Sequence, residues 1–230
     1  MKLKTMFLFA VLSSAASAVM AQSVQVRAGV NLANVSVNNS GSIDKAKELT
    51  SFQVGLVGDI PLGTKLFSFQ PGILFTGKGT KTQFGDPASN QYYKATSNPF
   101  YVEIPANFVI NLPMGSKGGF FVGAGPYVAV GVAGKNKVEG KSLGVAFSSE
   151  KNIRFSNDDP TTTNYEEGAG FGIMRRFDYG LNGIVGVESK PLVLSVGYGY
   201  GLAKLQSGTN SSANDANKHR VLSLTLGVKL

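Results

Sequence analysis

The only histidine of the chain, His219, has the side chain best suited to acid–base chemistry near neutral pH. Asp215 precedes it and Ser223 follows it, so an acid, a base and a hydroxyl occur in one short segment. Hydrolases that use a serine nucleophile need these three groups. Such a set at the outer rim of a membrane protein could act on lipid, but an exposed loop histidine is the simpler interpretation. We therefore predict no catalytic residues and no enzymatic activity.

Metal and nucleotide chemistry have less support. With one His and no Cys, the remaining ligands are scattered carboxylates such as the pairs at 158–159 and 166–167. The segment 77–81, GKGTK, lacks the spacing of a phosphate-binding loop and follows a predicted strand, so we interpret it as a turn. We predict no metal site and no cofactor.

A second set of ionisable residues lies on segments in which bulky apolar residues occupy every second position. The set consists of Arg27, Asp59, Glu103, Asp178, Glu188 and Lys229. Each of them falls on the opposite face, together with Gly, Ser, Asn and Gln. Four acids and two bases can pair inside a narrow lumen, with Arg27 as the obvious cation for Glu103, Asp178 and Glu188. We interpret the set as a structural polar network of the lumen, and a proton or ligand site is the alternative.

The clearest alternating segments form a hairpin within residues 98–132. Apolar residues occupy every second position from Phe100 to Ile110 and again from Phe120 to Val132, and a turn rich in Gly and Pro joins the two arms. Each arm exceeds the roughly 10 residues that a tilted strand needs to cross hydrocarbon. The pattern predicts two neighbouring strands of a barrel wall.

Similar segments recur along the whole chain. The predicted strands cover residues 23–33, 50–60, 65–77, the two arms of the hairpin, 170–189, 192–204 and 218–230. Long polar connections at 34–49, 78–96, 133–168 and 205–217 alternate with short turns. An even number of strands with all long loops at one end is typical of outer-membrane barrels. The predicted fold is all-β, an eight-stranded antiparallel up-and-down transmembrane β-barrel.

A soluble lipocalin-like barrel is the structural alternative, since it also has eight alternating strands. A soluble barrel needs its charged residues outside, whereas a membrane barrel needs them inside. No bulky-face position is charged, which favours the membrane. Aromatic residues also gather near strand ends, as in the girdles of membrane barrels. They are Phe52, Phe75, Phe100, Phe177, Tyr179 and Tyr200 toward the long loops, and Phe67, Phe108 and Phe120 toward the short turns.

The first residues read as a secretory signal peptide. A basic start is followed by an apolar run and then by small residues before Gln22, which predicts a signal peptide at 1–21 and a barrel domain at 22–230. The formal net charge of +8 suggests nucleic acid as a partner. An exported chain rarely meets nucleic acid, and the cations lie between strands, so we predict no such partner. The expected location is the outer membrane.

Four motifs in order along the chain point to a family. They are YVEIP at 101–105, GAGPY at 123–127, DYG at 178–180 with GVE at 186–188, and YGYGL at 198–202. With these motifs the chain resembles the PorT-like outer-membrane β-barrel family of Bacteroidota over essentially all of 22–230. The resemblance implies an eight-stranded outer-membrane barrel without an assigned activity in most members, and one branch is associated with protein secretion and surface assembly. Leu230 departs from the aromatic residue that usually ends the signal read by the barrel-insertion machinery.

Two functions are consistent with such a barrel. It can be a structural or interaction protein whose four external loops bind lipopolysaccharide, a surface ligand or a partner protein, or it can be a narrow channel. Side chains just fill the interior of an eight-stranded barrel, which favours the first function.

Cations are frequent at the predicted external end. Most share their loops with acids, as wet loops commonly do. They are Lys78, Lys81, Lys94, Lys135, Lys137 and Lys141. Five others have few acids beside them: Arg175, Arg176, Lys204, Lys218 and Arg220. We predict that these five contact the phosphates of lipopolysaccharide.

Overall fold

The computed structural model describes residues 23–36, 46–114, 118–156, 173–205 and 218–230. The predicted signal peptide, the two carboxylate pairs at 158–159 and 166–167, and Asp215 lie outside these residues, as does the predicted start of a strand at residue 170. No helix among the described residues is long and apolar enough to cross a membrane.

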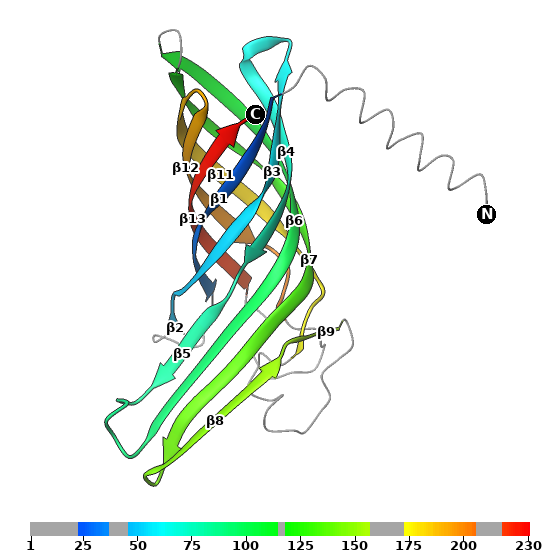
Figure 1. Cartoon of the computed structure of the whole chain (residues 1–230). Helices are drawn as coiled ribbons and strands as arrows, with labels where there is room; N and C mark the ends of the chain where they lie inside the picture. The colour runs from blue at the N-terminus through cyan, green and yellow to red at the C-terminus, as the bar shows by residue number, and fades with distance from the viewer. Residues whose placement is uncertain (1–22, 37–45, 115–117, 157–172, 206–217) are drawn as a thin grey trace, which may run out of the picture.

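Eight long strands form a closed antiparallel ring. They are β1 (Ser23–Ser36), β3 (Leu49–Leu62), β4 (Thr64–Gly77), β6 (Tyr92–Met114), β7 (Gly118–Ser142), β11 (Phe177–Ser189), β12 (Leu192–Gly201) and β13 (Lys218–Lys229). Each pairs with its neighbours in the chain, and β1 pairs with β13 to close the ring. The start of β1, the end of β13 and the short turns all lie at the same end of the barrel (Figure 1). The predicted eight-stranded up-and-down barrel is confirmed.

The wall of the barrel is apolar outside and polar inside. On β7 the outward Val128 is 57% exposed, whereas its neighbours Tyr127 and Ala129 are almost completely buried. The same alternation places Arg27, Glu103 and Asp178 in the interior. A soluble barrel would need the opposite arrangement, so the lipocalin-like alternative is wrong.

Aromatic side chains pack on each other across neighbouring strands of this outer surface. The ring of Phe100 lies 5.1 Å from that of Phe75 and 5.4 Å from that of Phe52, on β6, β4 and β3. Near the other end of the same wall, Phe69 and Phe108 have ring centroids 5.2 Å apart. Contacts of this kind add to the stability of a sheet beyond the area that they cover.

Three of the predicted loops are strands over part of their length, which corrects the boundaries at 34–49, 78–96 and 133–168. β6 begins at Tyr92 and β7 continues to Ser142, and both run beyond the barrel (Figure 1). β5 (Thr80–Phe84) and β8 (Val145–Asn152) pair with them, and the short β2 (Ala46–Lys47) pairs with β5. We call this projection of β5, β8 and the outer parts of β6 and β7 the outer sheet.

Two further short strands, β9 (Arg154–Phe155) and β10 (Ile173–Met174), pair with each other in parallel. They lie near the outer end of the barrel, where Phe155 contacts the lumen wall closely. A Cβ atom at Gly131 would lie only 2.2 Å from the ring of Phe155, so a side chain at this position would displace that ring.

Candidate functional site

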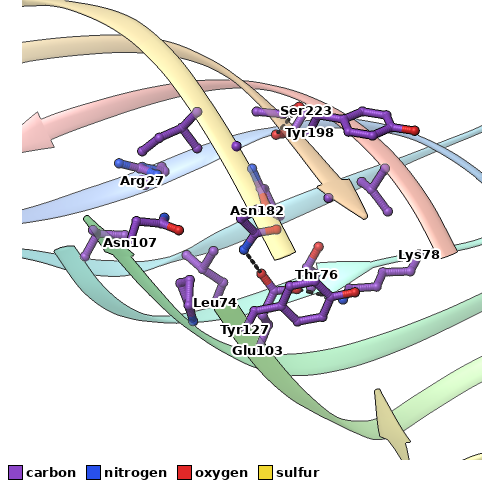
Figure 2. Close-up of a pocket in the computed structure, with 18 residues that line it drawn as sticks. Arg27, Leu74, Thr76, Lys78, Glu103, Asn107, Tyr127, Asn182, Tyr198 and Ser223 are labelled. Atoms are coloured by element: carbon purple, nitrogen blue, oxygen red, sulfur yellow. Dashed lines mark hydrogen bonds and ion pairs between the residues drawn. The ribbon is translucent and has the colours of Figure 1, made fainter. Parts of the chain in front are cut away.

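Lys78 is the centre of a buried ion cluster in the lumen (Figure 2). Its ammonium lies 2.7 Å from Glu103 Oε2 and 2.8 Å from Asp178 Oδ2, and it lies 3.9 Å from the centre of the Tyr127 ring. The Tyr127 hydroxyl donates a hydrogen bond of 3.1 Å to Asp178, and the Asn182 amide donates one of 3.1 Å to Glu103. One cation therefore neutralises carboxylates of β6 and β11, the two strands that flank β7.

This cluster corrects two predictions. Lys78 does not belong to the external rim, because its side chain is only 4% exposed and points into the lumen. Arg27 is not the cation for Glu103, Asp178 and Glu188, because it makes no ion pair among the described residues. The backbone explains the first correction: the chain continues past Gly77 in an extended conformation, and the Lys78 N–H donates to the Pro99 carbonyl at 3.0 Å.

A second ion cluster lies at the end of the barrel that carries the short turns. The Lys229 ammonium lies 3.0 Å from Asp59 Oδ2 and 2.6 Å from Glu188 Oε2. The Gln70 amide approaches Asp59 Oδ1 at 3.4 Å. The predicted polar network is thus divided into two clusters, each with one lysine and two acids.

Arg27 lies between these clusters and lines a small internal cavity. Its Nε and Nη2 atoms are buried and have no hydrogen-bond partner among the described residues. The cavity has a volume of about 50 Å³, and Glu103, Asn107 and Asn182 also line it (Figure 2). A polar cavity of this size can hold a few water molecules, which can supply the partners that Arg27 needs.

His219 is buried in the lumen, so the prediction of an exposed loop histidine is wrong. Its Nε2 lies 3.2 Å from the Tyr101 hydroxyl, and the two rings meet edge to face. Ser223 is four residues further along β13, about 13 Å away in an extended strand, and it donates to the Gly197 carbonyl. The described residues therefore contain no Ser–His pair, and they contain no group of metal ligands.

The inward residues of β6 show how the lumen is layered. Starting at the turn with β7, they are Asn111, Val109, Asn107, Pro105, Glu103 and Tyr101. Val109 belongs to a buried apolar cluster with Phe121 of β7 and Val193 of β12, and Ile184 packs against it. We call this cluster the inner plug. It separates the cavity beside Arg27 from the short-turn end of the barrel.

A second apolar cluster closes the other end. Val35, Ile153, Met174 and Leu205 are buried together, and Phe155 packs against them. Phe155 also packs against the cluster of Tyr101, Tyr127 and Ala129. We call these two connected clusters the outer plug. Side chains therefore fill the lumen at two separate levels.

An open cavity of about 650 Å³ lies outside the inner plug, at the short-turn end. Asp59, Glu188 and Lys229 line it, and so does Phe121 of the inner plug. The cavity is a vestibule that ends at the inner plug.

The five cations predicted to contact lipopolysaccharide lie together at the outer tips of β11, β12 and β13. Arg220 faces outward beside Tyr200: its guanidinium lies 3.7 Å from the ring centre and donates to the Gly201 and His219 carbonyls. Arg176 donates to the Phe155 carbonyl at 3.2 Å. The Arg175 N–H donates to the Leu205 carbonyl, which brings Arg175 next to the segment of Lys204. Lys218 shares the outward face of β13 with Arg220. We call these five residues the rim cations.

Comparison with known proteins identifies the barrel. Residues 20–207 match the family described as outer membrane protein beta-barrel domain. The chain belongs to this family. No curated protein matches it.

Two solved structures are similar to this outer-membrane barrel. One is Ail, the attachment invasion locus protein of Yersinia pestis, crystallised with the heparin analogue sucrose octasulfate, and the other is Neisserial surface protein A (NspA). Ail is 13% identical, the match covers 91% of this chain and 99% of Ail, and the TM-score is 0.39. NspA is 15% identical, with 90% and 97% coverage and a TM-score of 0.39.

Membership of the family places the barrel in the outer membrane. The short turns of outer-membrane barrels face the periplasm and the long connections face outward. The vestibule with Lys229 is then at the periplasmic end, and the outer sheet and the rim cations are at the external end.

Three of the sequence motifs converge on one place in the lumen of this outer-membrane barrel. Tyr101 and Glu103 of YVEIP, Tyr127 of GAGPY and Asp178 of DYG all surround Lys78. Sequence reasoning missed the central lysine. The alternation of β4 predicts its inward position: inward residues of β4 have even numbers, as in Gln70 and Thr76, and Lys78 continues that series.

Proposed function

We propose that this outer-membrane barrel is a non-enzymatic structural and interaction protein that works through its external end. The observation that carries the proposal is the filled lumen: the inner plug and the outer plug occupy it at two levels, and ion clusters lie on either side of the inner plug. A filled interior leaves the outer surface as the place for binding. The ion clusters then serve to hold the barrel wall together.

We propose lipopolysaccharide as the ligand of the rim cations. Arg220 lies outward at the level where the apolar wall ends, and the Tyr200 ring and two carbonyl oxygens fix its position. Each contact between a cation and anionic lipid contributes on the order of 1 kcal/mol, so several neighbouring contacts are needed for binding. Surface or secretion partner proteins are further candidates for the same end.

Replacing all five rim cations with Gln should weaken binding of the purified barrel to lipopolysaccharide. If each contact contributes on the order of 1 kcal/mol, the loss in affinity should exceed tenfold at low salt and shrink as salt is raised. Fluorescence titration with lipopolysaccharide measures this. Lys65→Gln with Lys190→Gln, at the periplasmic end, is the control. Unchanged binding in the five-residue variant would leave the rim cations as ordinary solvated charges.

A narrow channel is the alternative function. The two ion clusters and the cavity beside Arg27 give the lumen polar stretches, but the two plugs interrupt them. A lipid-modifying enzyme at the rim is less consistent with the structure, because His219 is buried and hydrogen-bonded to Tyr101.

The route to the membrane and the narrower family assignment are also part of the proposal. We propose export through a signal peptide cleaved after residue 21, followed by insertion by the barrel-insertion machinery. Membership of the PorT-like branch in Bacteroidota is supported by the order of the four motifs along the chain, three of which contribute residues around Lys78.

A further inference from the structure

The outer sheet has two different faces. Cross-strand pairs decide which residues share a face: Lys81 pairs with Thr96, Thr96 with Lys137, and Lys137 with Glu150. In the adjacent row Lys94 pairs with Glu139. We call this side the basic face. Its ionisable members are Lys81, Lys94, Lys135, Lys137, Lys141, Glu139 and Glu150.

The other face is largely uncharged. Phe84 pairs with Tyr93, Tyr93 with Gly140, and Gly140 with Phe147, so three aromatic residues form one row across the sheet. Lys151, which pairs with Asn136, is the lysine of β8 on this side. The two faces therefore suit different surroundings.

A β-bulge determines which side the lysines occupy. Tyr101 pairs with Gly131 but Phe100 pairs with Ala133, so Val132 is the extra residue of β7. Before the bulge the even-numbered residues of β7 face lipid. After the bulge the odd-numbered residues lie on this same outward side of the strand. Without the bulge, Lys135, Lys137 and Lys141 would be on the side of the barrel axis. Bulges redirect side chains in this way at the rims of barrels.

The basic face keeps an excess of three positive charges. Lys137 lies 2.6 Å from Glu139, Lys135 lies 2.6 Å from Glu150, and Lys94 lies 3.5 Å from Glu139. The hydrogen bond from Lys137 lowers the pKa of the Glu139 carboxyl, so this group stays ionised at neutral pH. Lys81 and Lys141 make no ion pair among the described residues.

The position of the basic face indicates what it meets. It continues the lipid-facing wall directly, because Phe100 is followed on the same side of β6 by Asn98, Thr96 and Lys94. The layer just outside hydrocarbon contains the phosphate-bearing saccharides of lipopolysaccharide. Alternate residues along a strand lie about 6.6 Å apart and neighbouring strands about 4.8 Å apart, so the lysines form a grid that can contact several anionic groups.

We propose that the basic face is a second contact surface for lipopolysaccharide, formed by the outer sheet and aimed at the molecules that surround the barrel in its own membrane. This inference rests on the proposed function and extends it from the rim cations on β11–β13 to the outer sheet formed by β5–β8. The basic face of the outer sheet then lies against the saccharide layer, and the aromatic face is turned away from that layer.

Site-resolved labelling of lysines tests the inference. The mature barrel is placed in vesicles of phosphatidylcholine, with or without lipopolysaccharide, and the rate of acetylation of each lysine is measured by mass spectrometry. Lipopolysaccharide should slow the labelling of Lys81, Lys137 and Lys141 by about fivefold, the factor that corresponds to one contact on the order of 1 kcal/mol. Lys151 on the opposite face and Lys65 at the periplasmic end should change much less.

The outcomes separate this inference from the proposed function. Protection of Lys204 and Lys218 alone would support the rim cations and overturn the basic face. Protection of the lysines of the basic face alone would support the basic face and overturn the rim cations as the contact with lipopolysaccharide. Equal slowing at Lys65 and Lys151 would indicate general exclusion of the reagent and overturn the basic face as a specific surface. In the triple variant Lys81→Gln, Lys137→Gln and Lys141→Gln, protection of Lys94 and Lys135 should fall toward the level without lipopolysaccharide. Full protection of these two lysines would contradict the grid.

Discussion

Replacing Lys78 with Met should lower the free energy of unfolding of the barrel by about 3–5 kcal/mol. Lys78 lies within 2.8 Å of both Glu103 and Asp178, and all three side chains are almost completely buried. Without the lysine, two carboxyl groups are left in the lumen without their cation and must either stay charged or take up protons. Breaking a buried ion pair by removing one partner has a cost of this size.

Urea unfolding of the barrel in lipid vesicles, followed by the difference in gel migration between folded and unfolded barrel, measures the effect. Lys81→Met is the matched control, because Lys81 is three residues away and lies on the basic face of the outer sheet. Its effect should be small. A Lys78 variant as stable as the Lys81 variant would show that the ion cluster does not hold the wall together.

Val128→Arg should destabilise the barrel by about 2–4 kcal/mol in lipid, because the new charge faces the bilayer near mid-strand. Val128 is 57% exposed on the outward face of β7. Leu224→Arg, on the outward face of β13 and 55% exposed, should behave in the same way. The measurement is the same urea titration in vesicles.

A change of Gln70 to Arg provides the control for the lipid-facing variants. Gln70 faces the lumen near Asp59, 3.4 Å away, so an arginine there has an acid within reach. It should be tolerated better than either lipid-facing arginine. Equal losses at Gln70, Val128 and Leu224 would contradict the assignment of the two faces of the wall.

The barrel could be predicted from the sequence because lipid imposes an uninterrupted pattern. A strand that crosses hydrocarbon must be apolar at its outward positions within the bilayer. This rule holds for β1 from Val24 to Leu32, β4 from Phe67 to Phe75, β7 from Phe120 to Val132 and β13 from Leu222 to Val228. The alternation then fixes which face each charged residue occupies. For this reason Arg27, Glu103 and Asp178 could be placed on the inward face, where the structure buries them, although their partners differ.

Partners within the lumen could not be predicted, since they depend on the stagger between strands far apart in the chain. Lys78 and Asp178 are one hundred residues apart and meet only because the barrel closes. The interpretation of His219 as a loop residue overlooks its odd numbering, which it shares with the inward Val221 and Thr225. Extending the alternation by one step would have placed both Lys78 and His219 inside.

The outer sheet was missed for a different reason. Its strands lie in water and carry polar residues on the basic face, so the apolar face by which strands are recognised is interrupted. Pairing in such a sheet depends on backbone hydrogen bonds and on cross-strand contacts such as that between Lys94 and Glu139. Neither is visible as a period in one segment of sequence.

Conductance of the purified barrel in a planar lipid bilayer tests the filled lumen most directly. The inner plug of Val109, Phe121 and Val193 and the outer plug around Phe155 should block ions, so the membrane current should stay at the level of the bare bilayer. Steady, ion-selective openings of a single conductance would contradict a filled lumen and support the narrow channel instead.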